Sequence, residues 1–185
     1  MGSNLDLHGI YVPLVTPFTS DDKPAYEEIE KLTKRYIDAG AAGIVALGTT
    51  GEPATLTADE AASVVKAIAG VCKSTSTQLI IGAGTNSTRT TLEAVERANA
   101  VEGATAVLSV VPYYTRPSES GIVQHFKTVA ANSDLPVVLY NIPHRTGRAL
   151  GAYSLIELAN VPNIAGIKQS VGVIDTDTLV LLANK

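Results

Sequence analysis

The stretch Ile164-Ala165-Gly166-Ile167-Lys168-Gln169-Ser170 places a lysine at the end of a short apolar run. Three of the four residues before Lys168 are apolar and the fourth is glycine, which predicts a buried strand of a parallel sheet. A lysine at the mouth of such a strand lies in a low dielectric, which disfavours the ammonium and lowers the pKa of the amine. The stretch therefore predicts either a lysine that forms Schiff bases with carbonyl compounds or one that carries its ammonium out to solvent.

Strand-like and helix-like segments alternate along the chain on both sides of this stretch. Apolar runs predict strands over residues 11–18, 42–47, 78–81, 106–111 and 136–140, and a sixth that ends at Lys168. Apolar residues at helical spacing predict helices over 26–39, 57–71, 92–98, 122–129, 155–158 and 178–183. Thr57 and Glu60 form the sequence signature of a capping box at the start of the second helix. Six strand–helix units without a long linker predict a parallel sheet of the α/β class, covered by helices.

Parallel strands joined by helices form either an open sheet or a barrel. An open sheet usually binds a nucleotide through a glycine-rich first turn, but residues 16–20 contain no glycine. Gly82-Ala83-Gly84 is too short for a dinucleotide motif. Reactive side chains follow the second, fourth, fifth and sixth strands, which is typical of a TIM-type (βα) barrel. We therefore expect a single partial barrel domain over residues 1–185, with about six of the eight βα units and truncated at the C-terminal side.

Composition excludes several classes of function. A net charge of −4 over 185 residues gives no electrostatic basis for binding nucleic acid or an anionic membrane. Cys72 is the single cysteine, so no internal disulfide forms, and this fits a reducing cytoplasm. No basic region followed by an apolar core marks a signal peptide, so we predict a cytoplasmic protein. His8 and His125 have no companions at metal-ligand spacing, so we predict no catalytic metal.

The turn after the second strand, Gly48-Thr49-Thr50-Gly51-Glu52, is the first candidate site segment. Two hydroxyls and several backbone N–H groups in a glycine-flanked turn suit a carboxylate or a carbonyl oxygen. The same residues also suit an ordinary turn with no ligand, in which the hydroxyls bond to the local backbone. The turn is therefore a candidate substrate-binding segment only in combination with other strand ends.

Tyrosines follow the fourth and fifth strands. Tyr113 and Tyr114 lie in a proline-bounded loop, where they serve packing or an interface, or supply a catalytic phenol. Tyr140 closes the fifth strand and could relay protons or simply bond to a neighbouring loop. Arg145 offers a planar fork for a substrate carboxylate or for a structural Asp or Glu, whereas His144 is expected to be a loop histidine rather than a base.

Taken together, these segments resemble the dihydrodipicolinate synthase family of pyruvate-dependent class I aldolases, a group that includes N-acetylneuraminate lyase. The resemblance extends over essentially the whole chain. It rests on Val15-Thr16-Pro17-Phe18, Gly48-Thr49-Thr50-Gly51-Glu52, Pro112-Tyr113-Tyr114, Tyr140-Asn141-Ile142-Pro143 and Gly166-Ile167-Lys168, in this order. Gln169 stands where the family commonly has an acidic residue.

The resemblance implies roles for single residues. Lys168 would form the Schiff base with pyruvate, and Thr49, Tyr140 and Tyr114 would form a hydroxyl proton relay, with Tyr114 lent to a neighbouring subunit. Thr50 and the adjacent N–H groups of the turn, which includes Gly48 and Gly51, would hold the pyruvate carboxylate. Arg145 would bind the carboxylate of aspartate semialdehyde, which favours the synthase over the lyase. No separate cofactor is implied, because the lysine itself supplies the electron sink.

The resemblance also implies that the chain stops early, because a complete barrel has eight units and about 250 residues. We expect a homo-oligomer in which another copy covers the open edges of the sheet. The implied function is condensation of pyruvate with aspartate semialdehyde in lysine and diaminopimelate biosynthesis, impaired or lost through truncation. The alternatives are a noncatalytic short form that assembles with other copies, and a pyruvate aldolase similar to N-acetylneuraminate lyase.

Overall fold

The computed structural model describes residues 5–173 and 175–184, which form two compact units. The N-terminal unit comprises Asp6–Gly82 and Ala100–Ala106. The C-terminal unit comprises Ala83–Asn99 and the chain from Val107 onward, together with Leu5 at the start. Among the described residues, no helix is both long enough and apolar enough to cross a membrane.

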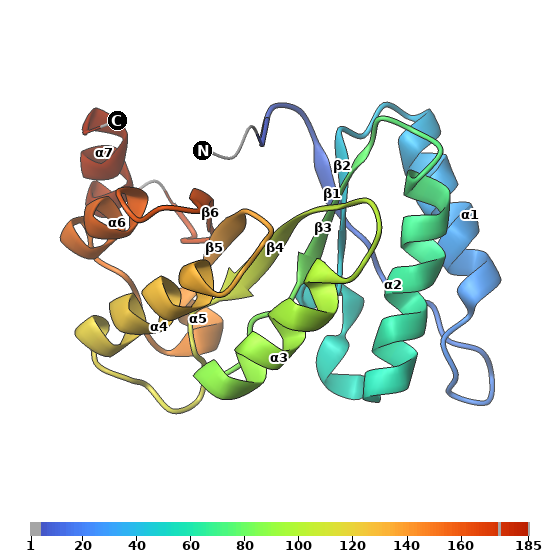
Figure 1. Ribbon diagram of the computed structural model, residues 1–185, viewed down its shortest axis with the longest axis horizontal. Coiled ribbons are helices and arrows are strands. Elements are labelled where there is room, and N and C mark those ends of the chain that lie inside the picture. Colours follow the sequence, from blue (N-terminus) through green and yellow to red (C-terminus); the bar gives the residue numbers. More distant parts are fainter. Residues whose placement is uncertain (1–4, 174, 185) are drawn as a thin grey trace. The chain divides into compact units, whose positions relative to one another are not determined.

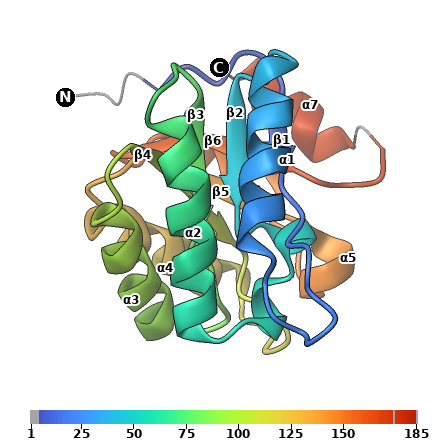
Figure 2. The ribbon, with the colours of Figure 1, turned by 90° about the vertical axis from the view of Figure 1, so that its right-hand side faces the viewer.

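The N-terminal unit is a parallel sheet with helices on one side. Its elements are β1 (Tyr11–Pro13), α1 (Tyr26–Asp38), β2 (Gly43–Ala46), the 3₁₀ turns η1 (Thr49–Gly51) and η2 (Pro53–Thr55), α2 (Ala58–Cys72) and β3 (Gln78–Gly82). β2 pairs with both β1 and β3 in parallel. Helices α1 and α2 lie side by side (Figure 2). Fully buried Ile29, Ile44 and Leu79 form part of the core of this unit.

The capping box predicted at the start of α2 is confirmed. The Thr57 hydroxyl accepts a hydrogen bond from the Glu60 backbone N–H, and a Glu60 carboxylate oxygen accepts one from the Thr57 N–H at 2.9 Å. Each of these bonds satisfies an N–H group that the first helical turn leaves without a partner. The helix therefore begins at the residue that the sequence pattern indicates.

The C-terminal unit repeats the alternation of strand and helix. Its elements are α3 (Thr88–Asn99), the part of β4 (Ala104–Val110) from Val107 onward, α4 (Glu119–Ala131), β5 (Val137–Asn141), α5 (Pro143–Thr146), α6 (Ala152–Ala159), β6 (Ile164–Gln169) and α7 (Thr176–Ala183). β5 pairs in parallel with β4 and with β6. Helices α3 and α4 lie side by side, as do α6 and α7 (Figure 1). The Asn163 side chain holds the entry to β6, because it donates to the carbonyl oxygens of Ala130, Ser133 and Leu135.

Two expectations about the strands are wrong in detail. The first strand ends at Pro13 rather than at residue 18, and Phe18 instead forms an isolated antiparallel bridge with Pro24. The Leu14 N–H still donates to the Val45 carbonyl at 3.1 Å, but Pro17 has no N–H with which to continue a ladder. The sixth strand is parallel as predicted, but all six of its residues are half-buried rather than buried. β6 stands last in the strand order, and β5 is the neighbour to which it pairs.

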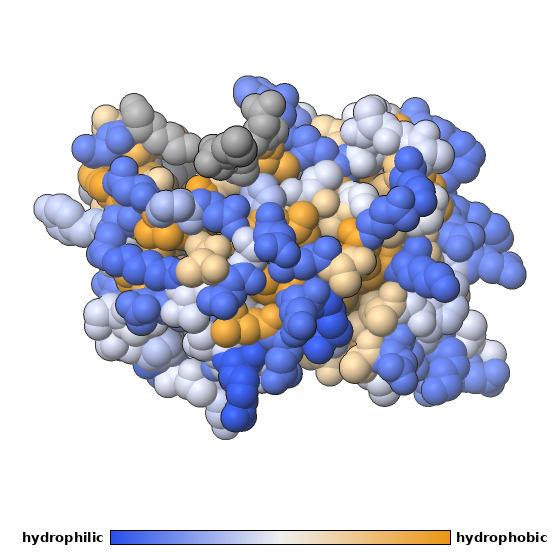
Figure 3. Space-filling view, in the orientation of Figure 1, coloured by the Kyte–Doolittle hydropathy of each residue, from blue (hydrophilic) through white to orange (hydrophobic). Residues whose placement is uncertain are grey.

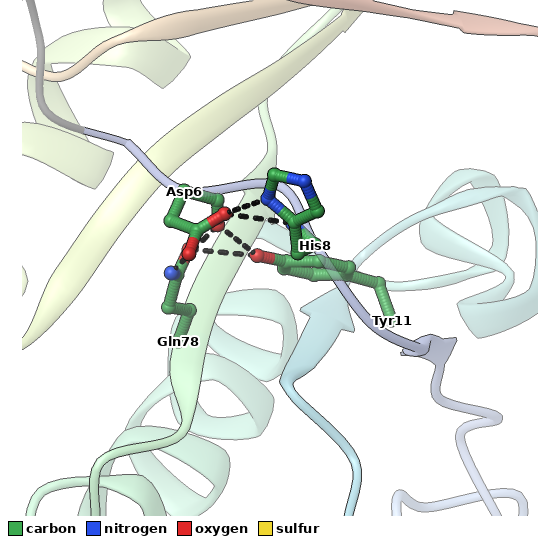
Figure 4. A network of polar contacts seen from close by, with 4 residues as sticks. All are labelled: Asp6, His8, Tyr11 and Gln78. Carbon is green, nitrogen blue, oxygen red and sulfur yellow. Dashed lines mark hydrogen bonds and ion pairs between the residues drawn. The ribbon is translucent and has the colours of Figure 1, made fainter.

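A polar network fixes the start of β1 to the start of β3 (Figure 4). The Tyr11 hydroxyl lies 2.6 Å from the Asp6 carbonyl oxygen and 2.9 Å from Oε1 of Gln78, and the Gln78 amide donates to the same Asp6 carbonyl. The carboxyl of Asp6 also bonds to His8, and these hydrogen bonds lower the pKa of that carboxyl below its ordinary value. Tyr11 and Gln78 each begin a strand, so the network lies at the amino ends of the strands. In barrel enzymes this end contributes to stability, whereas catalysis uses the carboxyl ends.

Candidate active site

Lys168 and Tyr140 face each other across the ladder between β5 and β6. They are register partners, and the Lys168 Nζ lies 4.3 Å from the centroid of the Tyr140 ring. Tyr140 is 5% exposed and Lys168 is half-buried. The face of an aromatic ring attracts positive charge, whether an ammonium or a protonated imine carries it. The carboxyl ends of these two strands thus hold an amine that is partly shielded from water and packed on a phenol.

The next pair along the same ladder is Asn141 and Gln169. The Asn141 side-chain amide donates to Oε1 of Gln169 at 2.9 Å, and Nε2 of Gln169 donates to the Thr178 hydroxyl at 3.1 Å. Successive residues of a strand point to opposite faces of the sheet. Asn141 and Gln169 therefore lie on the side that α7 covers, and Lys168 and Tyr140 point to the other side.

A cavity of about 100 Å³ also lies next to β6, but it has the wrong chemistry for pyruvate. It is lined by apolar side chains of β5, β6, α6 and α7, such as Leu139, Leu155 and Leu181. A carboxylate in such a lining would lose its hydration without gaining a hydrogen bond or an opposite charge. This cavity therefore does not suit a polar substrate.

The candidate residues of the N-terminal unit form one turn. Thr49 and Thr50 open the 3₁₀ turn η1, with exposed side chains, between the buried Gly48 and Gly51. The Gly51 N–H donates to the Gly48 carbonyl at 2.9 Å, and the Gly51 carbonyl accepts from the buried Thr16 hydroxyl at 2.7 Å. The backbone of Gly51 is thus used to build the turn, while the threonine side chains face outward and are accessible to a ligand.

The shape of this turn depends on its neighbours in the same unit. Leu47 and Glu52, on either side of the turn, have left-handed backbone conformations with φ of 53° and 54°. A Cβ atom at Gly82, the last residue of β3, would overlap the Leu47 carbonyl oxygen. Only glycine lets the Leu47 backbone come this close to β3. The end of β3 therefore determines where the turn with the two threonines begins.

The loop after β4 presents Tyr114 to solvent. Tyr114 is 88% exposed and has a φ of 70°, and Arg116 has a φ of 48°. Two non-glycine residues in the left-handed region within three positions indicate a backbone that its surroundings hold in place. The Tyr114 ring packs little within its own chain, as an aromatic residue at an interface would.

Arg145 lies in the short helix α5, and its side chain is exposed. The segment around it is joined to the loop after β4. Nε of Arg148 donates to the Pro117 carbonyl at 2.8 Å, and the Arg116 side chain lies against Gly147, where an added Cβ would be 2.9 Å from Nε of Arg116. The segments that carry Tyr114 and Arg145 are thus linked within the C-terminal unit.

The structure brings some of the sequence-derived candidates together and describes others separately. Lys168 and Tyr140 are in contact, and Tyr114 and Arg145 lie on linked segments, all in the C-terminal unit. Gly48, Thr49, Thr50 and Gly51 share one turn of the N-terminal unit. His144 is exposed in α5. Within residues 5–173 and 175–184, no three His, Cys, Asp or Glu side chains are grouped so that they could hold a metal ion.

The sequence interpretation missed the contacts behind the site. Thr16, which bonds to Gly51, and Thr178, which bonds to Gln169, received no role. The one available signal was that Asn141 and Gln169 each directly follow a candidate catalytic residue at a strand end. Residues in equivalent places of neighbouring parallel strands lie side by side, so this position predicts an amide pair.

Comparison with known proteins identifies the group to which the chain is similar. The model of the dihydrodipicolinate synthetase family matches residues 6–183. The 4-hydroxy-tetrahydrodipicolinate synthase of Moorella thermoacetica is 40% identical over 172 residues, which are 93% of this chain and 58% of the relative. The enzyme of the same name from Neisseria meningitidis serogroup B is 42% identical over 168 residues, which are 90% of this chain and 56% of the relative. The chain thus spans somewhat more than half the length of these curated relatives.

Solved structures show the same similarity at the level of the fold. The chloride-inhibited dihydrodipicolinate synthase of Acinetobacter baumannii, complexed with pyruvate, matches with a TM-score of 0.92 at 38% identity, over 97% of this chain and 61% of that one. The dihydrodipicolinate synthase of Thermotoga maritima matches with a TM-score of 0.88 at 35% identity, over 94% of this chain and 59% of that one. The fold prediction, an incomplete TIM-type barrel of the α/β class, is confirmed.

Proposed function

Because the chain belongs to the dihydrodipicolinate synthetase family, we propose that it carries the Schiff-base centre of a lyase that condenses pyruvate with aspartate semialdehyde. This is a step of lysine and diaminopimelate biosynthesis. The observation that carries the proposal is the amine of Lys168, 4.3 Å from the centroid of the buried Tyr140 ring at the carboxyl ends of two parallel strands. The relatives named above are synthases, which favours this activity over an N-acetylneuraminate lyase-like one.

In the proposed reaction, the neutral amine of Lys168 attacks the carbonyl carbon of pyruvate, and the carbonyl oxygen leaves as water. The protonated imine draws electrons from the methyl group, which loses a proton to give an enamine. The enamine carbon then forms a bond to the aldehyde carbon of the second substrate, and the aldehyde oxygen gains a proton. Water finally releases the product and restores the amine. The Tyr140 ring face favours the cationic imine, and Thr49, Tyr140 and Tyr114 are the proposed proton carriers.

The other candidates bind carboxylates in this proposal. The pyruvate carboxylate is bound by the exposed Thr50 hydroxyl and by backbone N–H groups of the turn that begins at Gly48. Gly51 gives this turn its shape. Arg145 binds the carboxylate of the aldehyde through its planar guanidinium. No cofactor is needed, because the imine itself withdraws the electrons.

Trapping with borohydride tests the central step. Incubation with pyruvate and borohydride is expected to convert Lys168 to its carboxyethyl derivative, which peptide mass spectrometry locates. Lys168→Arg is expected to abolish this label, whereas Lys127→Arg, on the exposed face of α4, is expected to retain it. If Lys168 stays unmodified under conditions that label a full-length synthase, the proposed function is wrong.

Turnover is a separate question from imine formation. The second candidate function is a noncatalytic short form that assembles with other copies. A coupled assay with pyruvate and aspartate semialdehyde distinguishes the two functions. Trapping with turnover supports the synthase, whereas trapping without turnover supports the short form.

We expect a homo-oligomer under either candidate function. Large apolar side chains are exposed on and beside α7, namely Val173, Leu179 and Leu182, and orange areas are visible around α6 and α7 in Figure 3. We propose that another copy of the chain covers this surface and the edge of β6. Light scattering is expected to give more than the monomer mass. A monodisperse monomer that does not bind a hydrophobic dye would contradict the proposal.

A further inference from the structure

The side chains behind Lys168 and Tyr140 form a bridge of three members, which we name the amide bridge: Asn141 in β5, Gln169 in β6 and Thr178 in α7. Asn141 donates to Gln169 at 2.9 Å, and Gln169 donates to Thr178 at 3.1 Å. The bridge thus links two strands and a helix immediately next to the residues of the proposed Schiff-base centre. The bridge is joined to this centre along the chain, because Asn141 directly follows Tyr140 and Gln169 directly follows Lys168.

The bridge supplies a hydrogen bond to a deeply buried side chain, that of Asn141. Asn141 is 1% exposed, and its Oδ1 has no hydrogen-bond partner among the described residues. The Asn141 side chain therefore depends on Gln169 for its hydrogen bond, and a buried amide left without any partner is costly. The Asn141 backbone carbonyl also accepts from the Ser170 N–H at 2.8 Å. Asn141 therefore bonds to the last residue of β6 through its side chain and to the following residue through its backbone.

The far end of the bridge is fixed by the start of α7. The Asp175 carboxylate caps this helix by accepting from the Thr178 N–H at 2.7 Å, which places the Thr178 hydroxyl on a defined first turn. The hydrogen bonds to Thr178 also lower the pKa of the Asp175 carboxyl below its ordinary value. Because α7 lies on the opposite side of the strands from Lys168, none of these groups can touch a substrate bound to the lysine.

We propose that Gln169 is a positioning residue that, through Asn141 and Thr178, fixes the end of β6 and thereby holds the Lys168 amine over the Tyr140 ring. Without the bridge, only the backbone ladder to β5 and the Ser170–Asn141 bond would hold the end of β6, whose six residues are all half-buried. Displacement of a reacting group by about 1 Å is enough to slow a reaction severely. The inference rests on the proposed function, because its effect is read at the lysine that forms the imine.

Matched variants test the bridge from its end on α7. Thr178→Val removes the hydroxyl and keeps the shape of the side chain, whereas Thr178→Ser restores the hydroxyl. Thr176→Val is a control on the same turn of α7, at an exposed position. Gln169→Met removes both hydrogen bonds from the middle of the bridge with little change in length. The rate of pyruvate trapping at Lys168 is measured for each variant below its unfolding temperature.

The maximal trapping rate is expected to fall roughly tenfold or more in Thr178→Val and Gln169→Met. It is expected to remain within about twofold of the unchanged chain in Thr178→Ser and Thr176→Val, since both keep the bridge. The pyruvate concentration for half-maximal trapping should stay the same, because these substitutions leave the groups proposed to bind the carboxylate unchanged. Wild-type rates in both Thr178→Val and Gln169→Met would overturn the proposal, as would failure of Thr178→Ser to recover.

Hydrogen exchange keeps this test separate from the proposed function. The Ser170 N–H is expected to exchange faster in Thr178→Val than in Thr178→Ser, because the end of β6 opens more often. If the unchanged chain is not labelled by pyruvate at all, the proposed function fails, and the exchange result alone then decides whether the bridge holds β6. Equal exchange of Ser170 in the two variants would overturn the inference in that case.

Discussion

His125 is a buried histidine of α4 whose imidazole has a lowered pKa. It is 4% exposed, its Nδ1 lies 2.9 Å from the Thr88 hydroxyl of α3, and its buried Nε2 has no hydrogen-bond partner within residues 5–173 and 175–184. Burial lowers the pKa of the imidazole from 6.5 to about 4. The folded protein therefore holds His125 neutral over a pH range in which the unfolded chain binds a proton.

The free energy of unfolding is expected to decrease as the pH falls from 6.5 toward 4. Below 6.5 the unfolded chain gains a proton that folded His125 does not bind, so acid favours unfolding. The slope from this one group is at most about 1.4 kcal/mol per pH unit, and its whole contribution is limited to roughly 3 kcal/mol. Urea unfolding at several pH values measures the slope. His125→Gln is expected to flatten it, and an unchanged slope in that variant would contradict the assignment, with exposed His144→Gln as the control.

Replacement of two glycines, one inside a helix and one at the end of a strand, is expected to have opposite effects on stability. Gly70 lies inside α2, where an added Cβ would meet no atom within 4 Å, whereas a Cβ at Gly82 would overlap the Leu47 carbonyl at the end of β3. Gly70→Ala is expected to stabilise the protein by about 0.5–1 kcal/mol, since alanine has less backbone freedom to lose on folding. Gly82→Ala is expected to be destabilising by several times that amount, because a backbone atom must move. Paired urea unfolding curves of the two variants measure the difference.

The type of each major helix and strand was predictable from the sequence, and several short elements were not. The helix at 26–39 and the strand at 78–81 are found within one residue of their expected ends, because their apolar spacing is regular. The turns η1 and η2 and the four-residue helix α5 have no periodic signal, since each is about one turn long and a helical face shows only over several turns. The half-exposure of β6 was also missed, because burial depends on neighbouring elements and not on the apolar run itself.

At the scale of the whole molecule, the same limit applies to the candidate site. Lys168 and Tyr140 could be paired from the sequence because both end parallel strands, and such ends gather at one edge of a sheet. The link from Gln169 to Thr178 could not, because it depends on how α7 returns over the strands. Local pattern thus predicted which candidate residues end neighbouring strands, whereas the contact of Gln169 with α7 was visible only in the three-dimensional structure.

The continuity of β4 leads to a prediction about cooperative unfolding. Ala104–Ala106 belong to the N-terminal unit, where the Thr105 hydroxyl donates to the Leu79 carbonyl of β3 at 2.9 Å. From Val107 onward the same strand belongs to the C-terminal unit, where Val107 pairs with Val137 of β5. Unfolding of either unit would therefore disorder one end of β4, and the other end of the same strand belongs to the other unit. We therefore expect the two units to unfold in a single transition, as for one domain over residues 1–185.

Two local probes measure this transition. Cys72, in the N-terminal unit, is 4% exposed, and burial raises the pKa of its thiol to about 11, so it should react with a thiol reagent only after its unit opens. Hydrogen exchange of the α4 amides reports on the C-terminal unit. Over a urea series, thiol reactivity and exchange are expected to give one midpoint. Two separate midpoints, with Cys72 reacting while α4 stays protected or the reverse, would show that the units are independent domains.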